Sequence, residues 1–263
     1  MQTGGHTGHA VLQHRRRFGG FGMTMQARGF VALWHNVPPG IDEEYNLVHT
    51  REHVPDYVAN AAGRGGIDFG RRYGEGKGQL PAYFMFYPAR DMTAFARLAQ
   101  KPWPEHPGGS SVWFNAIIDQ YRDSWRNNCR LLAQRGGGTG GAACSLIMPL
   151  SEEVVAGAPI VDDVLAWLIG LPPVVAVHLG VTDPDIAPNR PPLTRHDTAV
   201  GVMVIEGFSR LLLAQLLPEI LSRLEQSGIA TEKPRYGLYQ LAYELRAEEL
   251  DQVEPFPGSP RRW

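Results

Sequence analysis

The strongest constraint on the fold of this 263-residue chain is one order of strands and helices that occurs twice. A glycine-rich segment, 136–141, separates the two occurrences. Before it, apolar and alternating runs predict strands at 29–35, 66–73, 80–87 and 130–134, helices at 41–60, 91–100 and 110–127, and a turn at 74–79. After it, similar runs predict strands at 143–150, 174–181, 199–205 and 237–245 and helices at 162–169 and 208–226. Both halves therefore follow the order β-α-β-β-α-β.

That order is the split βαβ arrangement of the ferredoxin-like fold. Its sheet carries helices on one face, and the other apolar face needs a cover that a second sheet can supply. We therefore predict an α+β protein in which two tandem ferredoxin-like repeats pack their sheets into a dimeric-type α/β barrel. The expected parts are an N-terminal extension (1–27), a first repeat (28–135), a flexible linker (136–142) and a second repeat (143–263). Two unrelated α+β domains are the alternative, and closure within one chain or between two copies stays open.

The amino-acid composition limits which binding partners and which cellular compartment are expected. The net charge of −2 favours neither a nucleic acid nor an anionic membrane as partner, and no apolar run is long enough for a membrane span. The two cysteines, Cys129 and Cys144, are too few for a disulfide framework, so we expect reduced thiols in a cytoplasmic protein. The extension 1–27 is rich in Gly, His and Arg and is expected to be disordered. Its arginines at 15–17 precede glycines, whereas an export signal would continue with an apolar stretch.

The predicted helix 41–60 carries the residues most suited to chemistry. Helical spacing places Tyr45, His49, Glu52 and Asp56 on one stripe, with His53 at its edge. Residues 47, 54 and 58 form an apolar stripe on roughly the opposite side, which we expect to pack on the sheet. Pro55 lies inside this pattern, so the helix should kink or restart there, or simply end.

The ionisable stripe suggests proton transfer. Histidine is the side chain whose ordinary pKa suits acid–base catalysis near neutral pH, and a carboxylate such as Glu52 can orient it. Tyr45 can hold a substrate oxygen. A solvated helix face is the plain alternative. The letters His49-x-x-Glu52-His53 also match an inverted zinc-protease motif, but a third ligand is not evident.

The stretch from 36 to 73 resembles the EthD-like branch of the dimeric α/β-barrel superfamily. The residues that carry the resemblance are Asn36-Val37-Pro38, Glu44-Tyr45-Asn46, His49, Glu52-His53-Val54-Pro55 and Arg71-Arg72-Tyr73, followed by Tyr83 in the next strand and Trp125-Arg126-Asn127-Asn128-Cys129-Arg130 near the end of the repeat. The resemblance implies a pocket between sheet and helices that is lined by the motif histidines. Members of the superfamily include cofactor-free monooxygenases, cyclases, isomerases, lyases acting on aromatic catabolites, and haem enzymes.

We therefore expect a lyase or isomerase that needs no cofactor and acts on a small, aromatic, oxygenated metabolite, as in the catabolism of aromatic compounds. His49 and His53 would exchange protons, Glu52 would orient a histidine and Tyr45 would hold a substrate oxygen. The expected substrate contacts are Trp34, His35, Asn36, Arg72, Tyr83 and Trp103. A haem or other metal enzyme and a non-catalytic binding module are the alternatives.

The second repeat lacks a matching stripe. Its first predicted helix has no histidine, and His178 is expected to be a strand residue with satisfied hydrogen bonds and not a ligand. We therefore expect one site per chain, a structural second repeat and a homodimer. The sequence contains neither a dinucleotide fingerprint nor a Walker motif, and Gly74-x-Gly76-x-Gly78 lies between two predicted strands.

Overall fold

A computed structural model describes residues 28–60, 66–95, 111–183, 185–186 and 200–254. The elements of the first half are β1 (Gly29–Asn36), α1 (Asp42–Val48), the π-helical turn η1 (His49–His53), α2 (Val54–Asn60), β2 (Phe69–Gly78), β3 (Tyr83–Ala89), α4 (Val112–Ile118) and β4 (Arg122–Gly136). Those of the second half are β5 (Ala142–Pro149), α5 (Glu152–Val155), α6 (Ile160–Gly170), β6 (Val174–Thr182), β7 (Val200–Gly207), α7 (Arg210–Gln226), β8 (Arg235–Arg246) and the 3-10 helix η2 (Ala247–Gln252). The predicted extension 1–27 lies outside the described residues.

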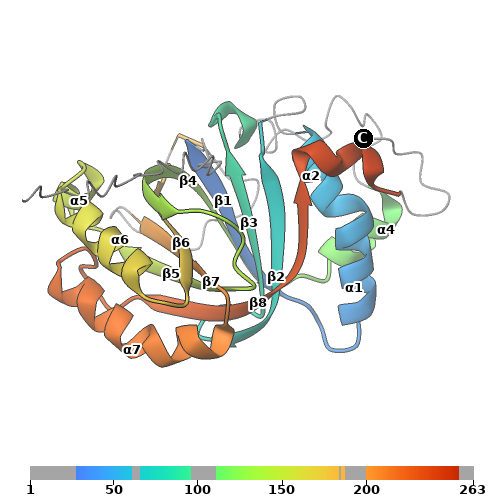
Figure 1. Cartoon of the computed structure of the whole chain (residues 1–263). Coiled ribbons are helices and arrows are strands. Elements are labelled where there is room, and N and C mark those ends of the chain that lie inside the picture. The colour runs from blue at the N-terminus through green and yellow to red at the C-terminus, as the bar shows by residue number, and fades with distance from the viewer. Residues whose placement is uncertain (1–27, 61–65, 96–110, 184, 187–199, 255–263) are drawn as a thin grey trace, which may run out of the picture.

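The eight strands just named close into one barrel in the order β1-β3-β2-β8-β5-β7-β6-β4. Within each half, the strand order is that of a ferredoxin-like sheet. Antiparallel pairs β2–β8 and β4–β6 join the two sheets along both edges. The predicted fold class is therefore confirmed, and the barrel closes within one chain. Figure 1 shows α5, α6 and α7 on one side of the barrel and α1, α2 and α4 on the other.

Three apolar layers follow from this arrangement. The barrel interior is largely aromatic and includes Phe30, Trp34, Phe84 and Phe86. The layer under α6 and α7 is aliphatic, whereas the layer under α1, α2 and α4 mixes apolar residues with buried tyrosines. No helix among the described residues is long and apolar enough to cross a membrane.

Several predicted boundaries are wrong, and the largest error concerns the end of the first repeat. The segment predicted as helix 110–127 contains only the short helix α4, because the chain turns at 119–121 and continues as the long strand β4. The predicted turn 74–79 belongs mostly to β2, which stays paired with β8 up to Gly78 through a register shift. Of the predicted helix 91–100, the residues after 95 lie outside the described part. Asp91 accepts a hydrogen bond from the Thr93 N–H, as an N-cap would.

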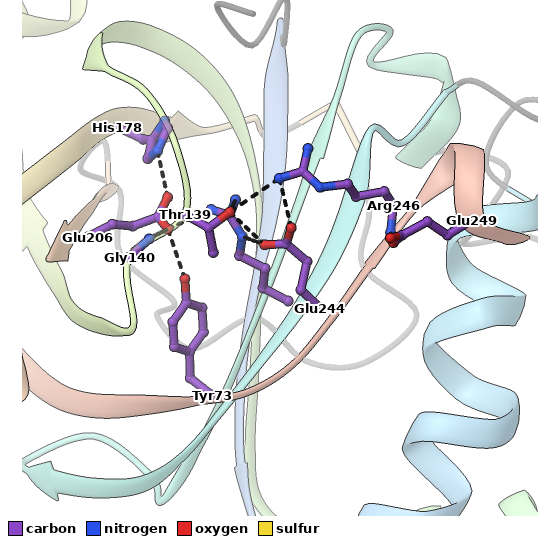
Figure 2. Close-up of polar contacts among 9 residues, drawn as sticks. Tyr73, Thr139, Gly140, His178, Glu206, Glu244, Arg246 and Glu249 are labelled. Carbon is purple, nitrogen blue, oxygen red and sulfur yellow. Dashed lines mark hydrogen bonds and ion pairs between the residues drawn. The ribbon is translucent and has the colours of Figure 1, made fainter. Parts of the chain in front are cut away.

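A charged network lies inside the barrel where the two sheets meet (Figure 2). Arg71 on β2 donates to Glu206 on β7 and to Glu244 on β8, at 2.5 Å in each case. Glu206 is fully buried and also accepts the Tyr73 hydroxyl at 3.0 Å, while His178 Nε2 lies 3.1 Å from its other oxygen. Because each charge has an opposite partner, the network links the repeats without leaving a charge uncompensated.

The segment between β4 and β5 takes part in this network, which corrects the expectation of a flexible linker. Thr139 Oγ1 accepts a hydrogen bond from Arg71 at 2.7 Å and lies 3.0 Å from Glu244. A side chain at Gly140 would collide with the backbone of Gly207, so only glycine fits this close approach. Both cysteines are free and buried, as the thiol prediction requires.

Replacing Glu206 by glutamine should lower the free energy of unfolding by about 3–5 kcal/mol, because it leaves the buried Arg71 without one of its two carboxylates. Urea unfolding followed by circular dichroism measures this change. The matched control is Glu225→Gln on the exposed side of α7, which should stay within about 0.5 kcal/mol of the parent.

The Glu206 contribution should also depend on pH. Burial raises the pKa of Glu206, but the His178 hydrogen bond and the Arg71 charge outweigh it, so the pKa lies below its usual value. A depressed pKa means that the stabilisation is complete above the ordinary glutamate range and is lost as the pH falls through the folded-state pKa. The difference between parent and variant should therefore shrink on acidification, and a difference that stays constant down to about pH 3 would contradict this account.

Candidate active site

A π-helical turn shapes the helix that carries the candidate residues. The Val54 N–H bonds to the carbonyl of His49, five residues earlier. Pro55 has no N–H and cannot bond to Arg51, so the wider turn directly before it absorbs the break in the ladder. The helix then restarts as α2 at Val54, as one of the sequence interpretations proposed.

The π turn directs His49, Glu52 and His53 into the protein. All three are buried, as are Tyr45 and Asp56, so the alternative of a solvated helix face is wrong. The apolar stripe was predicted only in part, because Val54 and Val58 are buried but Leu47 is 43% exposed. The stripe of ionisable groups faces the sheet and α4 instead of water.

Four rings from three segments form the centre of the cluster. His35, at the end of β1, places its Nε2 2.9 Å from the Tyr45 hydroxyl. Its ring stacks on that of Tyr121 at 4.0 Å between centroids. The Tyr121 hydroxyl hydrogen-bonds to Nε2 of His49, whose ring lies 4.3 Å from that of Tyr45. His49 Nδ1 has no hydrogen-bond partner within the described part of the chain.

The second part of the cluster lies one turn further along the helix. The ring of His53 stacks on Phe114 of α4 at 4.3 Å and meets the edge of His49 at 4.6 Å. Ser111, the N-cap of α4, donates its hydroxyl to Glu52 and accepts the Phe114 N–H. The α4 N-terminus therefore fixes Glu52 beside the two histidines.

Arg72 and Tyr83 approach the same cluster from the sheet. Arg72 Nη1 donates to the Asn46 carbonyl at 3.0 Å and to Thr50 Oγ1 at 3.2 Å. Tyr83 stacks beside His35 and donates its hydroxyl to Asp42 at 2.6 Å. Both residues thus hold α1 against the sheet while they face the histidines.

Two predicted contacts, Trp34 and Asn36, are not brought to this cluster. Trp34 points into the barrel interior, where it stacks on Phe84 and donates to Ser145. The Asn36 amide bridges the Ala82 N–H and the carboxylate of Asp123 at the end of the sheet. Trp103 lies outside the described residues.

Sequence reasoning missed Tyr121, Ser111 and Arg126. All three lie within the stretch interpreted as helix 110–127, and the error concealed the alternation of β4. Trp125 faces Trp34 across the ladder in the barrel interior, whereas Arg126 faces Leu33 on the helix side. Reading residues 122–129 as a strand would have placed Arg126 beside the candidate site.

Burial sets the protonation states at the centre. It lowers the pKa of His49 well below its usual value, and the neighbouring charges of His53, His35 and Arg72 lower it further. Burial also raises the pKa of Tyr45 well above its usual value. At neutral pH His49 is therefore an unprotonated imidazole and Tyr45 a protonated phenol, the forms that act as a base and as a hydrogen-bond donor.

Comparisons with known proteins identify the fold. No family model matches the chain, and no curated protein matches it. A solved structure described as an anthrone oxidase-like protein has 12% identity and a TM-score of 0.55, covering 84% of this chain and 94% of its own. A candidate monooxygenase from Fusobacterium nucleatum has 12% identity and a TM-score of 0.53, covering 84% of this chain and 95% of its own. A third, from Lactobacillus acidophilus, has 8% identity and a TM-score of 0.54, with 84% and 97% covered.

The chain therefore has the ferredoxin-like dimeric α/β-barrel fold. At these identities the likeness extends to the fold alone. Among the described residues, no group of three or more His, Cys, Asp or Glu side chains is arranged to hold a metal ion.

The protonation of His49 can be measured directly. Nitrogen NMR of the histidine side chains should show one imidazole that stays neutral down to about pH 5, where a free histidine, with a pKa of about 6.5, is charged. This signal should be missing from the His49→Gln spectrum and should titrate normally in urea. A His49 signal that titrates near its ordinary value in the folded protein would contradict the burial argument.

Proposed function

We propose that this protein is an acid–base enzyme, a lyase or isomerase, acting on a small, aromatic, oxygenated molecule with its own side chains. The observation that carries the proposal is His49, a buried neutral imidazole held through Nε2 by Tyr121 while Nδ1 has no partner among the described residues. An anchored imidazole with one open nitrogen is the arrangement of a general base.

The reaction step follows from the neighbouring groups. With Nε2–H donating to Tyr121, His49 Nδ1 takes a proton from a carbon next to a substrate carbonyl. The electron pair of that C–H bond forms a carbon–carbon double bond, and the π pair of the carbonyl moves to its oxygen, which gives an enolate or phenolate. The Tyr45 hydroxyl donates a hydrogen bond to this oxygen and stabilises it. The imidazolium then returns the proton to another carbon, or the enolate expels a leaving group that takes the proton.

The resemblance to the EthD-like branch supports the same assignment. The residues that carry it all belong to the first half of the chain and line one cluster: Tyr45, His49, Glu52, His53 and Arg72. Tyr243 of β8 also lies beside Arg72, at 5.7 Å from its guanidinium carbon. We infer that residues 28–135 hold the site and that residues 143–263 are structural. The neighbours described as monooxygenases and as anthrone oxidase-like suggest phenolic or anthrone-type probes.

Proton abstraction can be tested without knowing the substrate. Anthrone and phloroglucinol, incubated with the protein in D₂O without oxygen, should lose their carbon-bound proton signals faster than in buffer. His49→Gln should slow this exchange by about 100-fold or more, the usual contribution of a general base. The control Leu47→Ala changes an exposed residue of the same helix and should leave the rate unchanged.

Three outcomes would contradict the proposal. If the parent protein exchanges neither probe faster than His49→Gln does, His49 is not the general base. Loss of exchange after chelator treatment would contradict catalysis by the chain's own groups. Oxygen uptake that accompanies exchange in air would reassign the enzyme as a monooxygenase.

We also propose a homodimer. Barrel closure does not require it, because one chain supplies both sheets. Light scattering after size-exclusion chromatography should give twice the mass of the chain, and a monomeric mass at micromolar concentration would overturn this prediction.

A further inference from the structure

Two buried arginines beside the candidate site have no carboxylate partner in the described part of the protein. Arg72 and Arg126 are only 4% and 7% exposed. The acceptors of Arg72 are the Asn46 carbonyl and Thr50 Oγ1. Those of Arg126 are the side-chain oxygens of Asn128 and Tyr57, at 3.1 and 3.3 Å. All of these acceptors are neutral, so no described carboxylate pairs directly with either buried positive charge, which is unfavourable.

The strand register places the two arginines in one row on the helix side of the sheet. Arg126 pairs with Leu33, Leu33 with Met85, and Met85 with Arg72. Paired residues of antiparallel strands point to the same face, so both arginine side chains leave the sheet on its helix side. Tyr87 follows Met85 by two residues on β3 and therefore points to the same face.

Each of these three side chains has a buried polar atom without a hydrogen-bond partner in the described residues. The atoms are Arg72 Nε, Arg126 Nη2 and the Tyr87 hydroxyl. Burial raises the pKa of Tyr87, whereas the charges of Arg72 and Arg126 both act to lower it, so both charges lie within electrostatic reach of that phenol. Buried donors are nearly always satisfied in folded proteins, so three open ones on one face point to a missing acceptor.

The neighbouring Arg71 shows what a structural arginine in this sheet looks like. It occupies the other face of β2 and is matched by Glu206 and Glu244. Among the described residues, carboxylates contact Arg71 inside the barrel, but none contacts Arg72 or Arg126. A carboxylate that contacts these two guanidinium groups is therefore expected from a ligand.

We propose that Arg72, Arg126 and Tyr87 bind the carboxylate group of an aromatic acid, which is the substrate class of the site described above. This inference rests on the proposed function and names its substrate more closely. A carboxylate offers about four acceptor positions for two guanidinium groups and one phenol. Its ring would then extend over Leu33 and Met85 toward the histidine rings.

Binding of such an acid would also activate the base. Arg72 is one of the charges that lower the pKa of His49. A carboxylate beside Arg72 offsets that charge, so the pKa of His49 rises toward the working pH when the substrate is bound.

The test compares 4-hydroxybenzoate with 4-hydroxybenzamide, a neutral molecule of nearly the same shape, by isothermal titration calorimetry. The acid should bind at least about tenfold more tightly, as expected for a charge-assisted hydrogen bond. Arg126→Gln and Arg72→Gln should each weaken binding of the acid by about 10- to 100-fold and leave the amide nearly unaffected. The matched control Arg130→Gln, at an exposed position of the same strand, should change neither.

Tyr87→Phe gives an independent readout that does not depend on removing a charge. The variant deletes a buried hydroxyl without a partner in the described residues, so the free protein should melt at a higher temperature than the parent. The same variant should bind the acid more weakly. A merely structural tyrosine would not combine higher stability with weaker binding.

Equal affinity for acid and amide would overturn the proposal, as would an Arg126→Gln variant that is folded by circular dichroism and binds like Arg130→Gln. Binding of inorganic phosphate in place of the acid would overturn the carboxylate class. Arginine-dependent binding of the acid without proton exchange on any probe would retain this site and reject the proposed acid–base function. Exchange without arginine-dependent binding would do the reverse.

Discussion

The contact between Arg71 and Glu206 is the interaction on which the barrel depends. Arg71 belongs to the first sheet and Glu206 to the second, and they meet inside the barrel, where water cannot screen or replace their charges. Arg71 also faces Glu244 directly across the β2–β8 ladder, so one side chain joins a seam of the barrel to its opposite wall. A fully apolar interior could close as well, but a charged pair of fixed geometry permits fewer alternative registers.

Buried arginines on the two faces of the first sheet have different kinds of partner. Alternation along β2 sends Arg71 to the barrel interior and Arg72 to the helices. Arg71 meets two carboxylates, whereas Arg72 meets a carbonyl and a hydroxyl. Since uncompensated buried charge opposes folding, its presence on one face indicates that function, not stability, selects the residues there. This contrast supports the proposal that the site lies in the layer between the first sheet and its helices, and not in the barrel interior.

The element order was predictable because hydrophobic periodicity and glycine punctuation are local signals. The same locality explains the largest error. Residues 110–127 contain apolar spacings compatible with one helix, and only pairing with β1 makes residues 122–127 the start of a strand. The glycine-rich segment was interpreted as flexible from composition, whereas its structure depends on contacts with residues distant in sequence, Arg71 and Glu244.

The sequence predicted the residues of the candidate site that lie on its helix, but not those that other segments contribute. Helical spacing placed Tyr45, His49 and Glu52 together, since these residues lie within two turns of one another. Tyr121 and Arg126 lie 72 and 69 residues from their partners on this helix, His49 and Tyr57, and their positions depend on the register of β4. The π turn could not be predicted from regular helical periodicity. That periodicity places Leu47 on the side that packs on the sheet, whereas the Leu47 side chain is partly exposed.

The helix layers of the two repeats bury different kinds of side chain. Under α6 and α7 the buried layer consists of leucine, isoleucine, valine and alanine with two methionines and Cys144, so it gains the full free energy of apolar burial. Under α1, α2 and α4 the corresponding layer buries histidines, tyrosines and two arginines with unmatched donors. Such a layer is less stable by itself, and a tandem repeat fused through a closed barrel can compensate for it. The closed barrel thus joins an aliphatic layer in the second half to a polar layer in the first half.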